Sequence, residues 1–298
     1  MIRLYVIGAE GQVARSLREA AAAYPDFIIG FGARPRVDLL EPTSVAAAIT
    51  AFKPNVVINP AAFTSVDGAE AEPDLAFAIN RDGAQAVACA SREQGAPIIH
   101  MSSDYVFDGK KVGAYFETDE AGPQGVYGRS KLDGENAVAH ANPRHVILRT
   151  SWVYAPFGNN FVRTLLRLAD ERDRLRVVND QRGCPTYAPD IAVAIMSIAR
   201  KLVNWQPDYA GVTHLAGPDA MTWYEFAREI FRRTARRGGP FPSVEAISTS
   251  EYPTTALRPA NSQLSTQRLR SVFDITLPPM YLSLANCLER IFAERGSR

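Results

Sequence analysis

A tyrosine and a lysine four residues apart are the side chains in this sequence best suited to acid–base chemistry. The segment Tyr127-Gly128-Arg129-Ser130-Lys131 opens a stretch with helical spacing, so the phenol and the ammonium should share one helical face. A neighbouring ammonium favours the phenolate and lowers the pKa of a tyrosine, which suits Tyr127 to protonate an alkoxide as it forms. With eleven tyrosines in the chain, such a pair also arises by chance.

A hydroxyl upstream of this pair could complete a catalytic centre. Ser103 follows a predicted strand at its carboxyl end, where it could hydrogen-bond a ketone oxygen as negative charge develops there. Together with a glycine turn early in the chain, Ser103, Tyr127 and Lys131 predict an enzyme that acts on a carbonyl group. The alternative is a catalytically dead relative that keeps the fold.

The glycine turn lies at residues 8–14, between the first predicted strand and the first predicted helix, where a dinucleotide pyrophosphate binds. Gly8 allows a tight turn, Gly11 lets the backbone approach the pyrophosphate, and the helix N-terminus favours an anion. We therefore expect Gly8, Gly11, Gln12 and Val13 to bind the cofactor. A merely structural turn is the alternative.

The end of the second predicted strand indicates which dinucleotide binds. Arg34 and Arg36 stand where a strict NAD enzyme carries an acidic residue, and a guanidinium could pair with a 2′-phosphate. We expect NADPH and leave NADH open, with solvated loop arginines as the alternative. Asp38 and Leu39 should flank the adenine.

Small residues after the third predicted strand should leave room for the dinucleotide, or else serve tight packing: Ala61, Ala62 and Thr64.

The elements that must position these residues alternate in type along the first half of the chain. Short β-branched runs predict strands, and the longer amphipathic stretches between them predict helices. This alternation is typical of an α/β protein with a Rossmann-type doubly wound parallel sheet, whose sites lie at the carboxyl ends of its strands. The strands are expected at 4–8, 27–31, 56–59, 98–102 and 146–150, and the helices at 12–24, 43–52, 73–94 and 127–140.

After Thr150 the alternation gives way to aromatic and turn-rich segments, which are typical of loops that line a pocket. We expect residues 1–150, with return elements at about 188–216, to form an NAD(P)-binding Rossmann domain. Residues 151–187 and 217–298 should form mainly a smaller, discontinuous α/β lobe that binds the substrate.

Composition restricts the class of partner. The 298 residues carry a net charge of +1, without the basic excess that nucleic-acid binding needs. Four clustered arginines predict a solvated helix face, with a nucleic-acid patch as the alternative: Arg232, Arg233, Arg236 and Arg237. Three dispersed cysteines fit reduced thiols, and no apolar run approaches the roughly 18–20 residues that span a bilayer. We expect a cytoplasmic protein with neither a nucleic-acid nor a membrane partner.

Longer motifs indicate a family. Besides the glycine turn and the tyrosine–lysine helix, more discriminating motifs stand at residues 59–67, 103–109, 149–154, 158–161, 179–183 and 258–262. On these motifs, and over essentially its whole length, the chain resembles the extended short-chain dehydrogenase/reductases, and within them the dTDP-4-dehydrorhamnose reductases.

The resemblance implies hydride transfer from the nicotinamide to C4 of dTDP-4-dehydro-6-deoxy-L-mannose, giving dTDP-L-rhamnose. It implies that Tyr127 donates the proton, that Lys131 holds the nicotinamide ribose and tunes Tyr127, and that Ser103 takes the family's Ser or Thr role. It also implies two substrate-binding sets: Val66, Asp67, Asp104, Tyr105 and Trp152 around the sugar, and Asn160, Arg182 and Arg258 near the diphosphate or base. A core aromatic at Trp152 and a surface ion pair at Arg182 are the alternatives.

Some positions depart from the family pattern. Ala14 replaces the third glycine of the turn, and Gly68 stands where many relatives carry lysine. Ser16 and Pro189 occupy positions at which some members carry glutamates that bridge a dimer through a metal. Neither can supply a carboxylate, so we expect no metal and leave monomer or homodimer open.

Two rival functions follow from the same resemblance. Other 4-keto-6-deoxysugar reductases with this fold deliver hydride to the opposite face and give a talose-type epimer. Relatives also serve as non-catalytic regulatory subunits of methionine adenosyltransferase, and the presence of Ser103, Tyr127 and Lys131 argues against that role.

Overall fold

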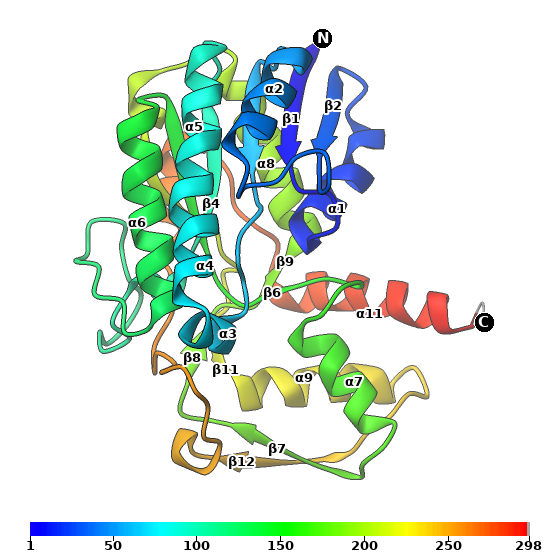
Figure 1. Ribbon diagram of the computed structural model, residues 1–298. Helices are drawn as coiled ribbons and strands as arrows, with labels where there is room; N and C mark the ends of the chain where they lie inside the picture. Colours follow the sequence, from blue (N-terminus) through cyan, green and yellow to red (C-terminus); the bar gives the residue numbers. More distant parts are fainter. Residues whose placement is uncertain (297–298) are drawn as a thin grey trace.

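A six-stranded parallel sheet forms the centre of the computed structural model, which describes residues 1–296 (Figure 1). The order β10-β5-β4-β3-β1-β2 places the switch point between β1 and β3. This confirms the predicted doubly wound α/β fold. The strands are β1 (Ile2–Ile7), β2 (Phe27–Gly32), β3 (Val56–Asn59), β4 (Ile98–Ser103), β5 (His145–Thr150) and β10 (Gly211–His214).

Helices cover both faces of this sheet because successive side chains of a strand point to opposite sides. Leu4 and Val6 of β1 belong to one hydrophobic core, and Tyr5 and Ile7 belong to the other. The first core is covered by α1 (Gln12–Ala20) and α8 (Ala188–Leu202), and the second by α2 (Pro42–Phe52), α5 (Ala84–Glu93) and α6 (Val126–Ala141).

The single helix predicted over residues 73–94 is divided in the structure. After the short α3 (Val66–Ala71), the chain forms α4 (Pro73–Phe77), a π-helical segment η2 (Ala78–Gly83) and then α5. Within η2 the buried Asn80 accepts a hydrogen bond from the Phe63 N–H at 2.8 Å and donates one to Ser130 Oγ at 2.9 Å. The wide π turn therefore ties the loop after β3 to helix α6, a role that amphipathic spacing does not indicate.

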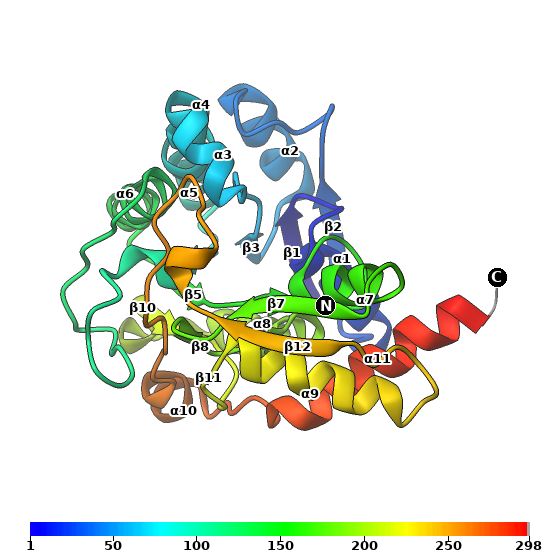
Figure 2. The ribbon, with the colours of Figure 1, turned by 90° about the horizontal axis from the view of Figure 1, so that it is seen from below.

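A smaller lobe lies below the sheet around its own hydrophobic core (Figure 1 and Figure 2). Side chains from every main element of the lobe meet there, including Leu165, Val177, Phe226 and Leu288. Within residues 1–296, no helix has both the length and the hydrophobicity to cross a bilayer. The main elements of the smaller lobe are α7 (Phe161–Ala169), β7 (Arg174–Val178), α9 (Trp223–Ala235), β12 (Ser243–Ile247) and α11 (Met280–Gly296). Strand β12 pairs in parallel with β7.

Short pairs of strands join the two parts. β6 (Val153–Tyr154) pairs with β9 (Thr186–Tyr187), and β8 (Arg182–Gly183) pairs with β11 (Met221–Thr222). Helix α10 (Gln267–Phe273) returns to the large sheet, where Leu269 and Phe273 join the core beneath α8. Short helical turns complete the chain: η1 (Ala21–Ala23), η3 (Asp104–Val106), η4 (Pro207–Tyr209) and η5 (Thr249–Glu251).

The contact between α6 and η2 leads to a stability prediction. A Cβ at Gly134 would lie 2.1 Å from the carbonyl oxygen of Asn80, a main-chain atom that cannot move independently. Gly134→Ala should therefore lower the free energy of unfolding by about 1–3 kcal/mol, despite the better helix propensity of alanine. Urea denaturation measures this change. Asn136→Ala, on the exposed face of the same helix, should leave stability nearly unchanged; an equal loss in both variants would contradict the account.

Candidate active site

Helix α6 brings the predicted acid–base pair to the carboxyl end of β4. The helix begins where the Val126 N–H donates to Glu70 Oε1 at 2.7 Å. A Cβ at Gly128 would lie 2.2 Å from the carbonyl oxygen of Tyr105, so glycine is required for the first turn of α6 to rest on η3. This close approach places Tyr127 beside Ser103, the last residue of β4.

The environment of Tyr127 favours its protonated form. Burial raises the pKa of its phenol; a hydrogen bond with Ser103 lowers it, and the charges of Asp104 and Tyr105 raise it further. The rings of Tyr105 and Tyr127 meet edge to face, with centroids 5.5 Å apart. The structure thus holds a protonated phenol next to a strand-end hydroxyl, an arrangement suited to donating a proton to a substrate oxygen.

Lys131 lies on the same helix but does not lower the pKa of Tyr127 as the sequence predicted. Only 2% of Lys131 is exposed, and its Nζ donates to the carbonyl oxygen of Met101 at 2.7 Å. Burial lowers the pKa of Lys131 to about 8, against the charge of Glu135, which raises it. The expectation of a lowered Tyr127 pKa is corrected: helical spacing gives proximity, but burial of the phenol dominates.

Asp104 adds a buried carboxyl group to this centre. It is 3% exposed, its Oδ1 accepts from Ser103 Oγ at 2.9 Å, and its Oδ2 has no hydrogen-bond partner among residues 1–296. Burial raises the pKa of Asp104 to about 6, although hydrogen bonds from Ser103 and Ser262 lower it. A buried acceptor without a partner can accept a hydrogen bond from a hydroxyl group of a polar ligand.

The glycine turn has the shape that a pyrophosphate needs. Gly8 adopts φ +93°, a conformation that favours glycine, and a Cβ there would lie 3.4 Å from the Cβ of Ala61 across the switch point. Apart from its chain neighbours, no atom of residues 1–296 lies within 4 Å of a Cβ built at Gly11, the N-cap of α1, so the backbone there is open to a ligand. Helix α1 has no acidic residue in its first turn, which favours an anion. These features fit a dinucleotide.

The other residues expected near the cofactor surround this turn. Arg34 and Arg36 are exposed after β2. The Asp38 carboxylate accepts from the Leu40 N–H at 3.0 Å, and Leu39 packs where a Cβ on Gly83 would lie. The small residues after β3 are half-buried or exposed, which leaves the strand tips accessible: Ala61, Ala62 and Thr64.

Three residues expected at the sugar or nucleotide contact one another. Arg258 Nη2 donates to Asp67 Oδ2 at 2.8 Å, and its Nη1 donates to the Tyr105 hydroxyl at 3.3 Å. The other Asp67 oxygen accepts from the Ala256 N–H at 2.9 Å. Asp67 therefore anchors the segment after β12 to the start of α3, next to the half-buried Val66.

Trp152 forms part of an aromatic wall. It adopts φ +47°, its ring stacks on Trp223 with centroids 3.4 Å apart and an interplanar angle of 4°, and a Cβ at Gly183 would lie 2.4 Å from its Cε2. Sequence reasoning missed Trp223, whose signal is its place directly after the N-cap of α9. Arg182 is exposed; it donates to the carbonyl oxygen of Ala220 at 3.0 Å and pairs with Glu225 at 3.7 Å, as a surface ion pair does.

Asn160 links the lobe to the glycine turn. Its Oδ1 caps α7 by accepting from the Arg163 N–H at 3.2 Å. Its Nδ2 donates to Gln12 Oε1 at 3.0 Å and to the carbonyl oxygens of Ala155 and Phe157. Every polar atom of this side chain is thus bonded within the protein, between the expected cofactor site and the substrate lobe.

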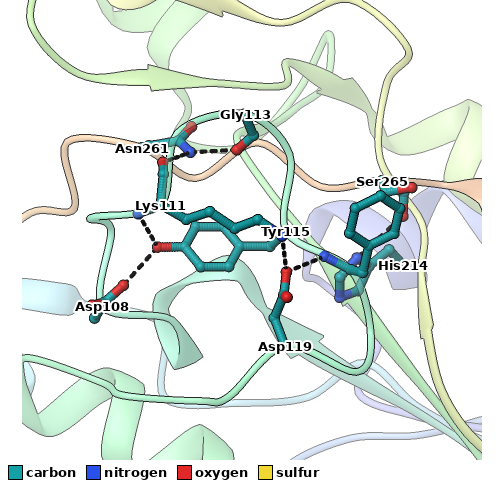
Figure 3. A network of polar contacts seen from close by, with 9 residues as sticks. Asp108, Lys111, Gly113, Tyr115, Asp119, His214, Asn261 and Ser265 are labelled. Atoms are coloured by element: carbon teal, nitrogen blue, oxygen red, sulfur yellow. Dashed lines mark hydrogen bonds and ion pairs between the residues drawn. The ribbon is translucent and has the colours of Figure 1, made fainter.

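A clamp that sequence reasoning also missed holds the loop at residues 107–119 against the segment at 259–265. Figure 3 shows Tyr115 donating from its hydroxyl to Asp108 Oδ1 at 2.6 Å and accepting from the Lys111 N–H at 3.1 Å. Asn261 Nδ2 donates to the carbonyl oxygens of Lys111 and Gly113, both at 2.7 Å.

The clamp holds residues that adjoin the candidate active site. Ser262, which follows Asn261, lies close enough to Asp104 to lower the pKa of its carboxyl group. Phe107, which stacks on Tyr115 with centroids 4.2 Å apart, follows η3 directly. The clamp therefore holds two neighbours of Asp104 in place.

Comparison with known proteins places this geometry in context. Residues 2–292 match the family model described as RmlD substrate binding domain. A protein named dTDP-4-dehydrorhamnose reductase from Sinorhizobium fredii (strain NBRC 101917 / NGR234) is 50% identical over 278 residues, covering 93% of each chain.

Solved structures agree with this similarity. The crystal structure of a dTDP-4-dehydrorhamnose reductase from Clostridium acetobutylicum ATCC 824 is 36% identical, with a TM-score of 0.89 over 97% of this chain and 99% of that one. The dTDP-4-dehydrorhamnose reductase from Bacillus anthracis str. Ames, crystallised in complex with NADP, is 36% identical, with a TM-score of 0.87 over 99% and 100% of the two chains.

The buried carboxyl group of Asp104 predicts a pH-dependent change in stability. The folded-state pKa of about 6 lies above the ordinary 3.8, so ionisation opposes folding as pH rises through this window. Asp104→Asn should raise the free energy of unfolding by roughly 2–3 kcal/mol at about pH 7.5 and very little near pH 4. Urea denaturation at both pH values measures the difference. The exposed Asp74→Asn serves as the control, and a gain independent of pH would contradict the assignment.

Proposed function

Because the chain belongs to the RmlD substrate binding domain family, we propose that it reduces the C4 keto group of dTDP-4-dehydro-6-deoxy-L-mannose with NADPH and yields dTDP-L-rhamnose. One observation carries the proposal: relatives named for this activity match nearly the whole chain at 36–50% identity. The juxtaposition of Ser103 and Tyr127 supports it, because this pair suits proton donation to a carbonyl oxygen.

The residues of the site divide the chemistry between them. NADPH, when bound, would supply a hydride for C4. Ser103 hydrogen-bonds the carbonyl oxygen, and Tyr127 gives that oxygen its proton, which leaves a phenolate to be reprotonated from solvent. Lys131 holds the nicotinamide ribose. Its proximity to a phenolate formed during turnover would stabilise that anion, whereas the resting phenol stays protonated.

The cofactor residues are assigned from the shape of the turn. The open backbone at Gly11, the left-handed Gly8 and the small Ala61 leave space for the pyrophosphate, with Gln12 and Val13 at the start of α1. Arg34 is proposed to pair with the 2′-phosphate because it is exposed directly after β2. The remaining assignments follow the strand tips: Asp38, Leu39, Ala61, Ala62 and Thr64.

The sugar nucleotide is proposed to lie between α6 and the lobe. Asp104 Oδ2 is the acceptor for a sugar hydroxyl, because it is buried without a partner among the described residues. Arg258 exchanges part of its pairing with Asp67 for the diphosphate, and Trp152 forms the wall backed by Trp223. The other proposed contacts are Val66, Tyr105, Asn160 and Arg182.

We also propose how the chain divides into a cofactor-binding and a substrate-binding part, and where in the cell it acts. Residues 1–150, with about 188–216, would bind the cofactor, and residues 151–187 and 217–298 would mainly bind the substrate, although α10 packs on the large sheet. We place the enzyme in the cytoplasm, where nucleotide sugars are made. We expect it to be a monomer or a homodimer.

Turnover with the proposed substrate is the experiment that tests this function. The chain should consume NADPH, followed by its absorbance, in the presence of enzymatically generated dTDP-4-dehydro-6-deoxy-L-mannose. An inactive chain that instead co-purifies in stoichiometric amounts with methionine adenosyltransferase would replace the enzymatic proposal with the regulatory one.

Replacing the phenol tests the role of Tyr127. Tyr127→Phe should lower kcat by about 10²–10⁴-fold and leave the Kd for NADPH within about twofold, because the hydroxyl acts in the transition state. Stopped-flow turnover and a fluorescence titration measure the two quantities. Tyr154→Phe removes the same hydroxyl from the lobe core and should retain wild-type kcat. Near-normal turnover by Tyr127→Phe would remove this residue from the mechanism.

We propose that Arg34 makes the chain prefer NADPH over NADH. Arg34→Ala should raise the Kd for NADPH about tenfold and leave the Kd for NADH nearly unchanged, since only NADPH carries the 2′-phosphate. Titration of both cofactors checks this. Arg92→Ala, an exposed arginine at the end of α5, is the control. Equal effects on both cofactors would show that Arg34 does not read the 2′-phosphate.

A further inference from the structure

A buried ion pair lies one helical turn from Lys131. Glu135 and Arg149 are 3% and 4% exposed. Arg149 Nε and Nη2 donate to Glu135 Oε1 and Oε2 at 2.8 and 2.6 Å, a bidentate pairing. Ser102 Oγ donates a third hydrogen bond to Oε1 at 2.5 Å. The carboxylate is thus fixed between α6, β4 and β5.

Stability alone is a weak explanation for such a pair. Removing two charges from water costs several kcal/mol per ion, and apolar residues of similar volume often stabilise a core equally well. The position of the pair is more informative. Ser102 and Arg149 are register partners near the carboxyl ends of β4 and β5, beside the Ser103–Thr150 pair that ends both strands. The pair therefore belongs to the catalytic edge of the sheet.

The surroundings of Lys131 leave Glu135 as its anionic neighbour. His100 of β4 also interacts with Lys131, but burial lowers the pKa of His100 well below its ordinary value, so this imidazole stays neutral. Charged groups on other elements packed against α6 have partners of their own: Asp67 of α3 pairs with Arg258, Glu70 of α3 accepts from the Val126 N–H, Arg81 of η2 pairs with Asp82, and Asp104 of η3 accepts from Ser103. Asp74 of α4 and Arg92 and Glu93 of α5 are exposed, and Arg149 of β5 pairs with Glu135 itself.

We propose that Glu135 is a positioning residue: fixed by Arg149 and Ser102, its carboxylate keeps the Lys131 side chain a charged donor at the end of β4. The catalytic use of that charge, to hold the nicotinamide ribose beside Tyr127, rests on the proposed function. Burial already lowers the pKa of Lys131 to about 8 while Glu135 raises it. Without that carboxylate the amine would lose its proton at a lower pH.

Direct titration of Lys131 tests the proposal without cofactor or turnover. The full chain contains five lysines, so ¹³C-labelled lysine gives a simple spectrum in which Lys131→Met assigns the signal. In Glu135→Gln the titration midpoint of Lys131 should move to lower pH. Asp133→Asn, which removes a charge from the same helix next to Arg81, should leave it unchanged. An unmoved midpoint in Glu135→Gln would overturn the proposal.

A second variant separates charge from folding. Glu135→Gln leaves the Arg149 guanidinium buried without its partner, which can unfold the chain. Combining Glu135→Gln with Arg149→Met removes both charges, and the Lys131 midpoint should again move to lower pH. A wild-type midpoint in this folded double variant would show that the pair serves only to attach α6 to the sheet.

Activity then connects the charge to catalysis. In the folded variants the alkaline limb of kcat should move to lower pH with the Lys131 midpoint, by about tenfold in rate for each unit at pH values above it. If wild type itself lacks reductase activity, the proposed function fails, and the titration still decides the role of Glu135. A shifted midpoint with an unshifted kcat profile would show that the charge on Lys131 is not used in turnover.

Discussion

Helix α6 packs directly on η3 and on the π turn η2 because glycines occupy the two positions where its backbone meets theirs. A Cβ at Gly128 would lie 2.2 Å from the carbonyl oxygen of Tyr105, and one at Gly134 would lie 2.1 Å from that of Asn80. The helix therefore lies directly against η3 and the π turn, and it carries the half-buried Tyr127 and the buried Lys131 and Glu135 along one side. The site, its electrostatics and the attachment of the loop after β3 depend on this approach.

Burial then sets the protonation states at the site. The same exclusion of water raises the pKa of Tyr127 and of Asp104 and lowers that of Lys131. Three charged side chains have fixed partners: Asp104 Oδ1 accepts from Ser103, Lys131 donates to the Met101 carbonyl oxygen, and Glu135 accepts from Arg149. The proton donor Tyr127, the cation Lys131 and Asp104 Oδ2, which has no hydrogen-bond partner among residues 1–296, are thus organised before any ligand binds, as electrostatic preorganisation requires.

Local patterns in the sequence predicted much of this arrangement, because β-branched runs, amphipathic stretches and a glycine turn after β1 depend on neighbouring residues. The doubly wound sheet and the gathering of Ser103 and Tyr127 followed from them. The π turn at Asn80, the Trp152–Trp223 stack and the Asn261 clamp depend on contacts between segments distant in the chain, which no local period records. The direction of the Tyr127 pKa shift was mispredicted, because spacing reveals a neighbouring charge but not the depth of burial.

Transfer of the hydride tests the central claim most directly. The chain would be incubated with NADPH deuterated at the transferred position of the nicotinamide and with dTDP-4-dehydro-6-deoxy-L-mannose, and the product examined by NMR. The account predicts dTDP-L-rhamnose with deuterium at C4. Deuterium at C4 of the talose epimer would contradict the proposed product and keep the site chemistry, whereas a product without deuterium would contradict hydride transfer by this chain.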